Sequence, residues 1–447
     1  MNRMKTISEI NTRKVAHFSR EDQHRLAKEA FDMSSRCLSP VRDGVIDVTY
    51  KNNTIDPHNP LVWSYGHILF FWEVFFCRFV YPNQTYPILN NVDNLYDSFV
   101  IGETNFMSRF NDDNHSLEQL SEYAETIWKD VEKWTLHSKK QAKHENYAFM
   151  TCLLHTHMHI ECFLFDYQMF NMRNPLQNDC PERRSLSLNQ ENLDLEMVTV
   201  VGGSFIQGSP NDGTAMVWDN ELSRFKTFVK TFQISKYPIT QKQYLDFVVS
   251  GGYADPHNWS IQGEAWRKKT HSTCPLYWTL ENGVWHRLHF GFWLPLEPDF
   301  PMMHVNYYEA EAYCKWAGGR LALESEWEYV ATEGGTNNRL DTDACNLDYE
   351  HGDIRSVKDG VVNSLGVGDM IGNVWCWCKD PFYPYPNYNI EPLYREFSYP
   401  FFGYKMILRG GCWAVPKILI SKFYRNAQPA DMRKHFTGFR LVREYNN

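Results

Sequence analysis

The chain has no apolar run long enough to cross a membrane and no excess of basic residues. Its most apolar early stretch, residues 68–80, contains Glu73 and Arg78 and is far shorter than the roughly 20 residues of a spanning helix. The first 14 residues contain no apolar core of a secretory signal. With 45 Lys and Arg against 54 Asp and Glu, the formal net charge is −9. We therefore expect neither a membrane nor a nucleic-acid partner.

A disulfide framework is also missing. The eleven cysteines are odd in number and follow no regular spacing, which favours a reduced, cytoplasmic protein. Glycine (25) and proline (21) are too scarce for a collagenous or low-complexity chain. The length of 447 residues is sufficient for two or three domains with a sizeable core.

The first part of the chain, residues 15–172, is rich in helical periods. Ser19 and Ser116 each precede acidic or amide residues in the way that helix N-caps do. Residues 144–170 predict a long helix that is apolar nearly all round and therefore central. About four helices are expected, which is compatible with an up-down bundle.

A polar, turn-rich segment at residues 173–192 predicts a linker. After it, in residues 193–447, glycines beside aromatic residues separate short β-rich runs. Only two clear helices are expected there, at about 308–316 and 325–332. The whole chain is thus expected to be of the α+β class.

The motif H-T-H-M-H-I-E carries the strongest chemical signal. On the expected helix, His155 and His159 are one turn apart and share a face, whereas His157 points away. Two such imidazoles can chelate a transition metal but need a third ligand. His67, within an otherwise apolar helix, is the candidate, because a buried histidine is costly unless its nitrogens are satisfied. Each of them could also be a hydrogen-bonded core histidine, and spacing alone does not choose between iron and zinc.

These motifs resemble a known family. G-H-I-L-F-F-W-E, around His67, and H-x-x-x-H-x-E, from His155, look like the metal-binding pattern of the DinB-like four-helix bundles in non-haem iron sulfoxide synthases. Those enzymes act in ergothioneine and ovothiol biosynthesis. The second half resembles their formylglycine-generating-enzyme (sulfatase-modifying factor) domain, a C-type-lectin-like fold. Its matching segments include residues 218–221, 304–321, 324–328, 372–377, 408–413 and 438–441.

The resemblance implies a reaction. His67, His155 and His159 would hold iron(II), and O2 would be the co-substrate for oxidative C–S bond formation between an imidazole and a thiol, giving a sulfoxide. The terminal segment is more similar to the ergothioneine branch, and no third, methyltransferase domain is expected, as ovothiol synthases commonly carry. Hercynine is therefore the implied imidazole substrate, in a protein that is a monomer or dimer.

The implied substrate-binding tail begins at Arg425 and Asn426. In relatives that use γ-glutamylcysteine, an acidic residue and an arginine follow. Here these positions fall on Gln428 and Met432, with Arg433 next to the latter. The resemblance therefore favours cysteine over γ-glutamylcysteine as the thiol.

The family also uses a tyrosine near the iron as a proton or electron donor, and Tyr388 and Tyr394 lie in the corresponding segment. Other interpretations stay open. They are the same chemistry on histidine or on a selenium donor, a non-catalytic metal- or ligand-binding homologue, and a zinc hydrolase that uses His155 with His157.

Several charged residues of the second half are interpreted as structural. Arg320, Glu324 and Glu328 are expected to form a buried polar network, because charges are retained in a core only when paired. Arg409 is expected to be structural as well. Residues 218–221 are expected to hold a loop together.

Overall fold

The computed structural model describes residues 18–45, 59–102, 106–110, 114–138, 141–177, 193–213 and 215–445. The chain divides into two compact units. The first comprises residues 1–166 together with 211–216 and 391–396, and the second comprises the rest. Most of the predicted linker, residues 178–192, lies outside the described residues. Within the described part, every helix is too short or too polar to traverse a lipid bilayer.

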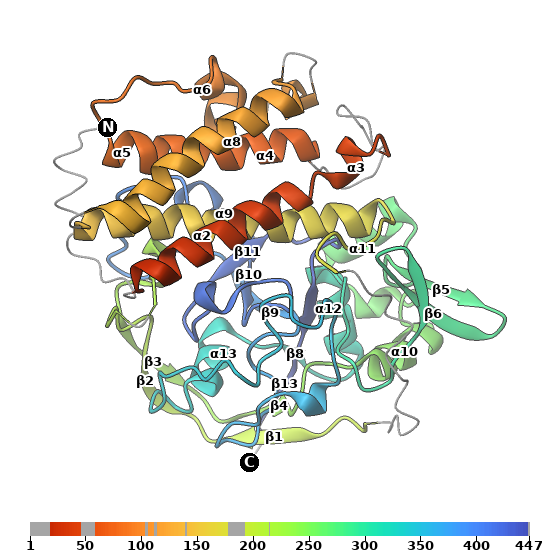
Figure 1. Cartoon of the computed structure of the whole chain (residues 1–447). Helices are drawn as coiled ribbons and strands as arrows, with labels where there is room; N and C mark the ends of the chain where they lie inside the picture. Colours follow the sequence, from red (N-terminus) through yellow and green to blue (C-terminus); the bar gives the residue numbers. More distant parts are fainter. Residues whose placement is uncertain are drawn as a thin grey trace. The chain divides into compact units, whose positions relative to one another are not determined.

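The first unit is helical (Figure 1). Its long helices are α2 (Arg20–Arg36), α4 (Leu61–Trp72), α8 (Leu117–Glu132) and α9 (Lys143–Met169). Helix α4 runs on through a π-helical turn, η1 (Glu73–Cys77), into α5 (Arg78–Val80), and α8 runs on into a second π-helical turn, η3 (Lys133–His137). The short helices are α3 (Ser39–Arg42), α6 (Val92–Leu95), α7 (Ser98–Ile101) and η2 (Phe106–Phe110).

The predicted helix starts are confirmed. The Ser19 hydroxyl accepts a hydrogen bond from the amide of Asp22, and Ser116 forms a capping box with Gln119. Helix α9 covers the predicted 144–170 almost residue for residue. Every residue of α4 is buried, as its nearly continuous apolar sequence requires.

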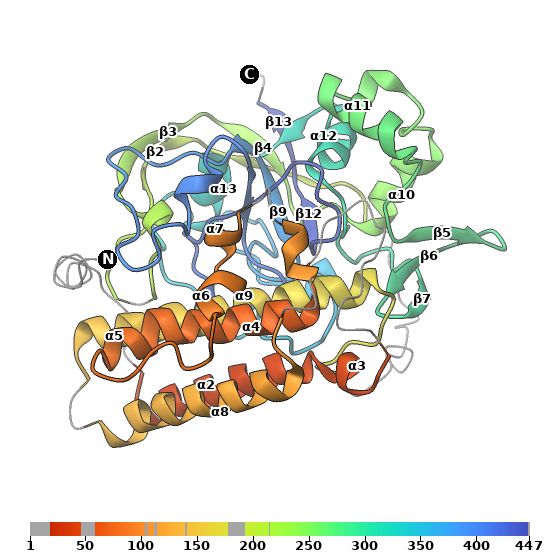
Figure 2. The ribbon, with the colours of Figure 1, turned by 90° about the horizontal axis from the view of Figure 1, so that it is seen from above.

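Side-chain hydrogen bonds join the long helices, which run side by side in Figure 2. Trp72 Nε1 on α4 donates to Thr156 Oγ1 on α9 at 2.8 Å. Gln23 Nε2 on α2 donates to Asn146 Oδ1 on α9 at 2.7 Å. Helix α9 is therefore fixed to both neighbours by polar contacts as well as by apolar packing.

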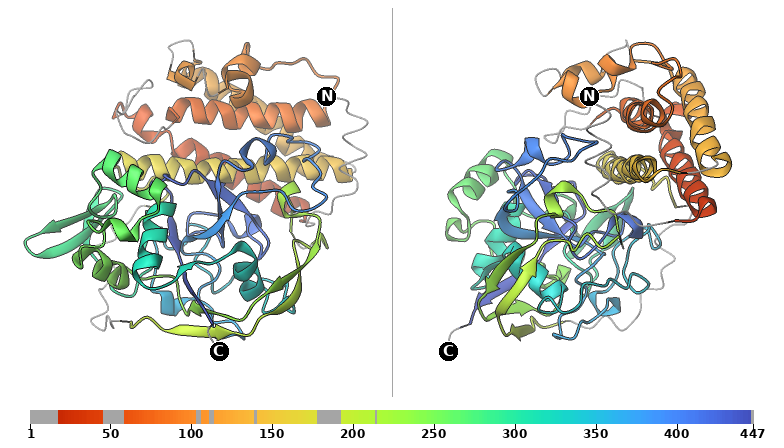
Figure 3. Two further views of the ribbon diagram at one scale, coloured as in Figure 1. Left: turned by 180° about the vertical axis from the view of Figure 1, so that it is seen from behind. Right: turned by 90° about the vertical axis from the view of Figure 1, so that its left-hand side faces the viewer.

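The second unit combines short sheets with short helices. One antiparallel sheet has the order β1 (Met197–Val200), β4 (Phe232–Ser235), β13 (Leu441–Glu444), β8 (Arg320–Leu321). Another has the order β11 (Asn426–Gln428), β10 (Met406–Arg409), β9 (Trp375–Pro381), β12 (Thr437–Phe439), with β12 parallel to β9. A hairpin joins β2 (Gly203–Gln207) and β3 (Phe225–Val229). A three-stranded sheet, green in Figure 3, contains β5 (Trp278–Glu281), β6 (Val284–His289) and β7 (Phe292–Pro295).

The described residues of the second unit contain more helices than the two that the sequence predicts. The helices are α10 (Gln241–Val249), α11 (Ile261–Thr270), α12 (Tyr307–Trp316) and α13 (Glu324–Ala331), with 3-10 turns η5 (Asp219–Glu221), η6 (Pro256–Asn258), η7 (Val357–Asp359), η8 (Tyr399–Phe401) and η9 (Lys417–Leu419). Helices α12 and α13 confirm the two that the sequence predicts at 308–316 and 325–332, whereas α10 and α11 were not predicted.

A buried ion network sits on α13. Arg409, fully buried, contacts Glu324 at 2.8 Å and Glu328 at 2.9 Å. Burial would raise the pKa of Glu324, but Arg425 and Arg409 together hold that pKa below its usual value. The predicted network is thus confirmed for both glutamates. The prediction was wrong for Arg320, which lies on the edge strand β8 and pairs instead with the buried Glu326 and the exposed Glu444.

The network generates a stability prediction. Arg409→Leu leaves the buried Glu328 without its cation and leaves Glu324 with Arg425 alone, and we expect a loss of about 3–5 kcal/mol in the free energy of unfolding. Arg320→Leu breaks an exposed pair with Glu444 and a half-buried pair with Glu326, which keeps its hydrogen bond from the Leu323 amide, and is expected to cost less, about 1–2 kcal/mol. Urea unfolding of both variants measures the difference. Equal losses in the two variants would contradict the larger contribution expected of the buried network.

Candidate metal centre

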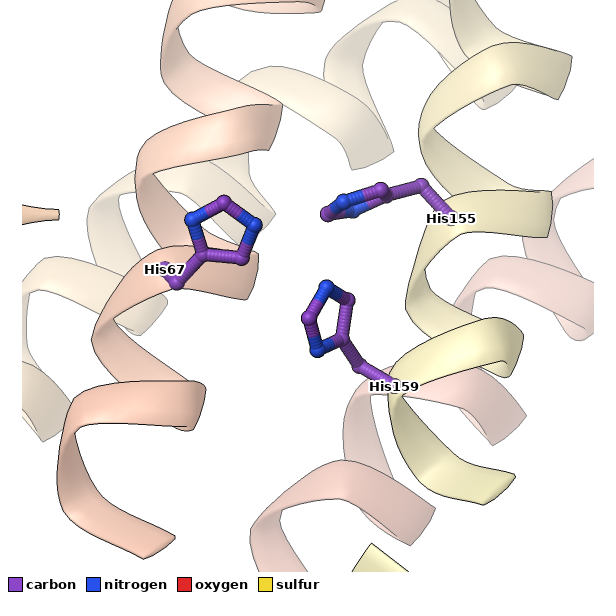
Figure 4. Close-up of side chains that lie close together, drawn as sticks. All are labelled: His67, His155 and His159. Carbon is purple, nitrogen blue, oxygen red and sulfur yellow. The ribbon is translucent and has the colours of Figure 1, made fainter. Parts of the chain in front are cut away.

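Three histidines from two helices converge on one space in the first unit. His67 lies on α4, and His155 and His159 lie one turn apart on α9, so that both α9 rings face α4 (Figure 4). One potential ligand nitrogen from each ring lies within 4.8 Å of the other two. His157 is not part of this group, because two residues of helix turn it away from its neighbours.

Burial keeps these imidazoles uncharged. It lowers the pKa of His67 to about 4. Burial also holds the pKa of His155 and of His159 well below the usual value, and the neighbouring histidines lower both further. All three rings are therefore neutral near pH 7. A neutral imidazole carries the lone pair that a metal ion needs.

The hydrogen bonds of the cluster fit a metal centre. His67 Nδ1 lies 2.6 Å from the carbonyl oxygen of Tyr96, to which it can donate, so Nε2 remains as the ligand atom. Nδ1 of His155 and Nδ1 of His159 are buried and have no hydrogen-bond partner within the described ranges. Unsatisfied buried nitrogens on neutral rings are costly in a plain core. They are consistent with a site completed by a metal ion.

The donor set narrows the choice of ion. Three imidazoles suit iron, zinc, copper or nickel, and they leave coordination positions for further ligands. The nearby Glu73 is already used elsewhere, because it pairs with Arg78 at 2.5 Å and accepts a 2.6 Å hydrogen bond from Tyr123. In the described part of the chain, the group of possible ligands contains histidines only.

A short segment from late in the chain belongs to the same unit. Within residues 391–396, Glu391 accepts a hydrogen bond from the Tyr147 hydroxyl on α9. The ring of Tyr394 lies 5.8 Å from that of His155 and 4.9 Å from that of Phe71, which itself stacks on His155 at 3.6 Å. Burial raises the pKa of Tyr394, so that its hydroxyl keeps its proton at neutral pH.

The other candidate tyrosine, Tyr388, lies in the second unit. Its hydroxyl donates to Asp219, which also accepts from Ser398. Trp218 stacks on Phe397 at 4.0 Å. This arrangement confirms that residues 218–221 hold a loop together.

The predicted substrate-binding arginines make many internal contacts in the second unit. The Arg425 guanidinium donates to both carboxylate oxygens of Glu324, at 2.6 and 3.0 Å, and to the carbonyls of Asn220 and Tyr383. Arg433 donates to both carboxylate oxygens of Glu309 at 2.8 and 3.1 Å. Both are thereby bound to carboxylates of their own unit.

The remaining predicted substrate-binding residues, Asn426 and Gln428, lie on the edge strand β11 and are half-buried. The Asn426 side chain accepts from the amide of Ala427. The structure thus brings His67, His155, His159 and Tyr394 together in one unit and places the predicted substrate-binding tail in the other.

Comparisons with known proteins assign the chain to a family. Residues 183–445 match the sulfatase-modifying factor enzyme 1-like domain. The chain is 30% identical over 437 residues to the hercynine oxygenase of Mycolicibacterium thermoresistibile. The matched region covers 93% of this chain and 94% of that protein. The hercynine oxygenase of Mycobacterium tuberculosis is 30% identical over 403 residues, with coverages of 86% and 91%. The chain belongs to the hercynine oxygenase family.

Membership of the hercynine oxygenase family confirms two expectations. The chain is an oxygenase of the sulfoxide-synthase type, and its second half is the C-type-lectin-like sulfatase-modifying-factor domain. An oxygenase uses O2, and the three histidines are a possible metal site for that use. Among solved structures, PvdO from Pseudomonas aeruginosa matches this chain at 24% identity. The match covers 56% of this chain and 95% of the PvdO chain, with a TM-score of 0.39, which indicates only a weak structural likeness.

Sequence reasoning missed the supporting residues. The contact of Tyr96 with His67 joins positions 29 residues apart, and Tyr147 with Glu391 joins positions 244 apart. No local pattern encodes such pairs. The one available signal is Gly66, directly before His67, where a Cβ atom would come within 2.3 Å of the Tyr96 ring.

Metal binding by histidine variants of this member of the hercynine oxygenase family tests the three-ligand geometry. His67→Ala and His159→Ala each remove one of three ligands, and we expect each to raise the Kd for Co(II), an oxygen-stable probe, at least about 100-fold. His157→Ala, two residues from His159 on the same helix and as buried as His67 and His155, is the control and should change the Kd less than about threefold. Anaerobic titration of the three proteins measures these constants. Loss of binding in His157→Ala alone would contradict the assignment.

Proposed function

We propose that this protein is an iron(II)- and O2-dependent sulfoxide synthase that joins hercynine to a thiol in ergothioneine biosynthesis. The observation that carries the proposal is the convergence of three neutral histidines in a chain of the hercynine oxygenase family. In this proposal the helical unit is a DinB-like four-helix bundle, residues 15–172, and residues 173–192 link it to the domain of residues 193–447.

The chain's own residues would perform two tasks. His67, His155 and His159 hold the metal through neutral nitrogens. The buried aromatic rings around them, including Phe71, keep bulk water from the site. Iron(II), when bound, would supply the redox chemistry that couples O2 reduction to C–S bond formation. Placing both substrates at one metal supplies much of the rate advantage.

Tyr394 is the proposed proton donor. Its ring belongs to the same unit as the histidines and lies 5.8 Å from His155. Because burial raises its pKa, the hydroxyl is protonated when the reaction begins and can donate. Tyr388, whose hydroxyl is bound to Asp219 in the second unit, is the weaker candidate.

Cysteine is the proposed thiol. A γ-glutamyl donor carries an additional carboxylate, which a cation in the tail would have to bind. Arg425 and Arg433 are each committed to a glutamate, Glu324 and Glu309, and Gln428 stands where relatives that use γ-glutamylcysteine carry an acidic residue. These features support the smaller substrate.

Product analysis tests the reaction. Anaerobic protein loaded with one equivalent of Fe(II) is exposed to O2 with hercynine and cysteine, and mass spectrometry identifies the products. We expect a hercynine–cysteine sulfoxide, and a kcat/KM for cysteine at least about tenfold above that for γ-glutamylcysteine. Histidine in place of hercynine, and selenocysteine in place of cysteine, serve as comparison substrates. Iron binding without any C–S product from any pair would overturn the proposal in favour of a non-catalytic homologue.

The tyrosine assignment has its own test. Tyr394→Phe removes the proposed proton donor while keeping the ring, and we expect sulfoxide formation to fall about 100-fold or more, with cysteine sulfinic acid as the main remaining product. Tyr388→Phe loses the hydrogen bond to Asp219 in the second unit and should leave the product ratio unchanged. The ratio of the two products in each variant is the measurement. The opposite pattern would assign the role to Tyr388.

A further inference from the structure

We propose that Trp63 is a positioning residue that, together with the consecutive carbonyls of Leu95 and Tyr96, sets the orientation of the ligand His67. The inference rests on the proposed metal centre and adds to it a support that lies outside the ligand set. Trp63 touches neither of the other two histidines in any described ring contact.

The indole and the imidazole are neighbours on one helix. Trp63 and His67 are four residues apart on α4, so their side chains lie on the same face. Their rings are stacked, with centroids 5.2 Å apart and planes within 10° of parallel. Trp63 is 1% exposed and His67 6% exposed. Stacking in a buried environment restricts the tilt of each ring relative to the other.

Two adjacent backbone carbonyls fix the same two rings. Trp63 Nε1 donates to the carbonyl oxygen of Leu95 at 2.7 Å, and His67 Nδ1 lies 2.6 Å from the carbonyl oxygen of Tyr96. Both carbonyls stand at the end of the short helix α6, where carbonyl groups have no partner within the helix. The plane and the direction of the His67 ring are thus both set from α6.

Helix α6 is itself held against α4 and its continuation. Arg78, on α5, pairs with Asp93 of α6 at 2.7 Å and with the buried Glu73 at 2.5 Å. Gly66 permits the close approach of Tyr96, since any Cβ there would meet its ring at 2.3 Å. The segment that carries the two carbonyls is therefore held at two places, by the Arg78–Asp93 ion pair and by the contact of Tyr96 with Gly66.

A cation completes the support of Trp63. The Arg109 guanidinium lies 4.3 Å from the centre of the indole ring, and its Nη1 donates to Asn59 at 2.6 Å. Cation–π attraction adds to the restraint on the indole plane. The result is a preorganised His67, whose free nitrogen faces the metal position before the ion arrives. Preorganisation increases affinity because less ordering is left to occur on binding.

The test compares Trp63 with a matched tryptophan of the same unit. Trp134 is equally buried, donates through Nε1 to Glu145 at 3.2 Å, and stacks on Phe149 at 5.1 Å, but has no described contact with the histidines. Trp63→Phe and Trp63→Leu are measured against Trp134→Phe and Trp134→Leu. Co(II) is the probe, and each protein gives a Kd and a visible absorption spectrum, which reports coordination geometry.

We expect Trp63→Leu to raise the Co(II) Kd about 10- to 100-fold and to change the visible spectrum. Trp63→Phe keeps a ring but loses the bond to Leu95, and should give a smaller change of the same kind. Both Trp134 variants should keep the wild-type Kd within about threefold and the wild-type spectrum. If Trp63→Leu does not fold, Trp63→Phe decides alone.

The outcomes separate two failures. Wild-type protein that binds no Co(II) would overturn the metal centre itself. Wild-type binding with an unchanged Kd and spectrum in the Trp63 variants would overturn only the positioning role. Equal effects in the Trp63 and Trp134 variants would also overturn it, because they would show a general loss of packing.

Discussion

Three imidazoles buried at one place constrain the residues around them. Without metal each ring must stay uncharged, because moving an imidazolium out of water costs several kcal/mol. Burial lowers the pKa of His67 to about 4 and holds the pKa of His155 and of His159 well below the usual value. Each ring must also turn a lone pair toward the shared space. Apolar neighbours and neutral hydrogen-bond acceptors keep such rings uncharged and fix their directions.

The surroundings meet this demand. Every residue of α4 is buried, and the acceptor for His67 is the carbonyl of Tyr96 rather than a carboxylate. Three neutral ligands leave the full charge of a divalent ion uncompensated. Such a centre favours an anionic atom at its open positions, and a thiolate is one. The neutral ligand set therefore favours the binding of the proposed thiol substrate as a thiolate.

The sequence predicted what local rules control. Helix caps located the starts of α2 and α8, and the long apolar run located α9, where the four-residue spacing placed His155 and His159 on one face. Contacts between residues far apart in the sequence were not predicted. Tyr394 reaches the helical unit through a segment far along the chain, and Arg425 is paired with Glu324, 101 residues away. Resemblance suggested the function of these residues, but which partner each one contacts depends on tertiary packing.

The most direct test of the account is X-ray absorption spectroscopy at the metal edge of anaerobic, Fe(II)-loaded protein. The fine structure counts the imidazole nitrogens bound to the ion. The account predicts three imidazoles and no sulfur in the absence of substrate, with sulfur appearing when cysteine is added. Fewer than two imidazoles, or a sulfur ligand before any thiol is present, would contradict a centre built from His67, His155 and His159.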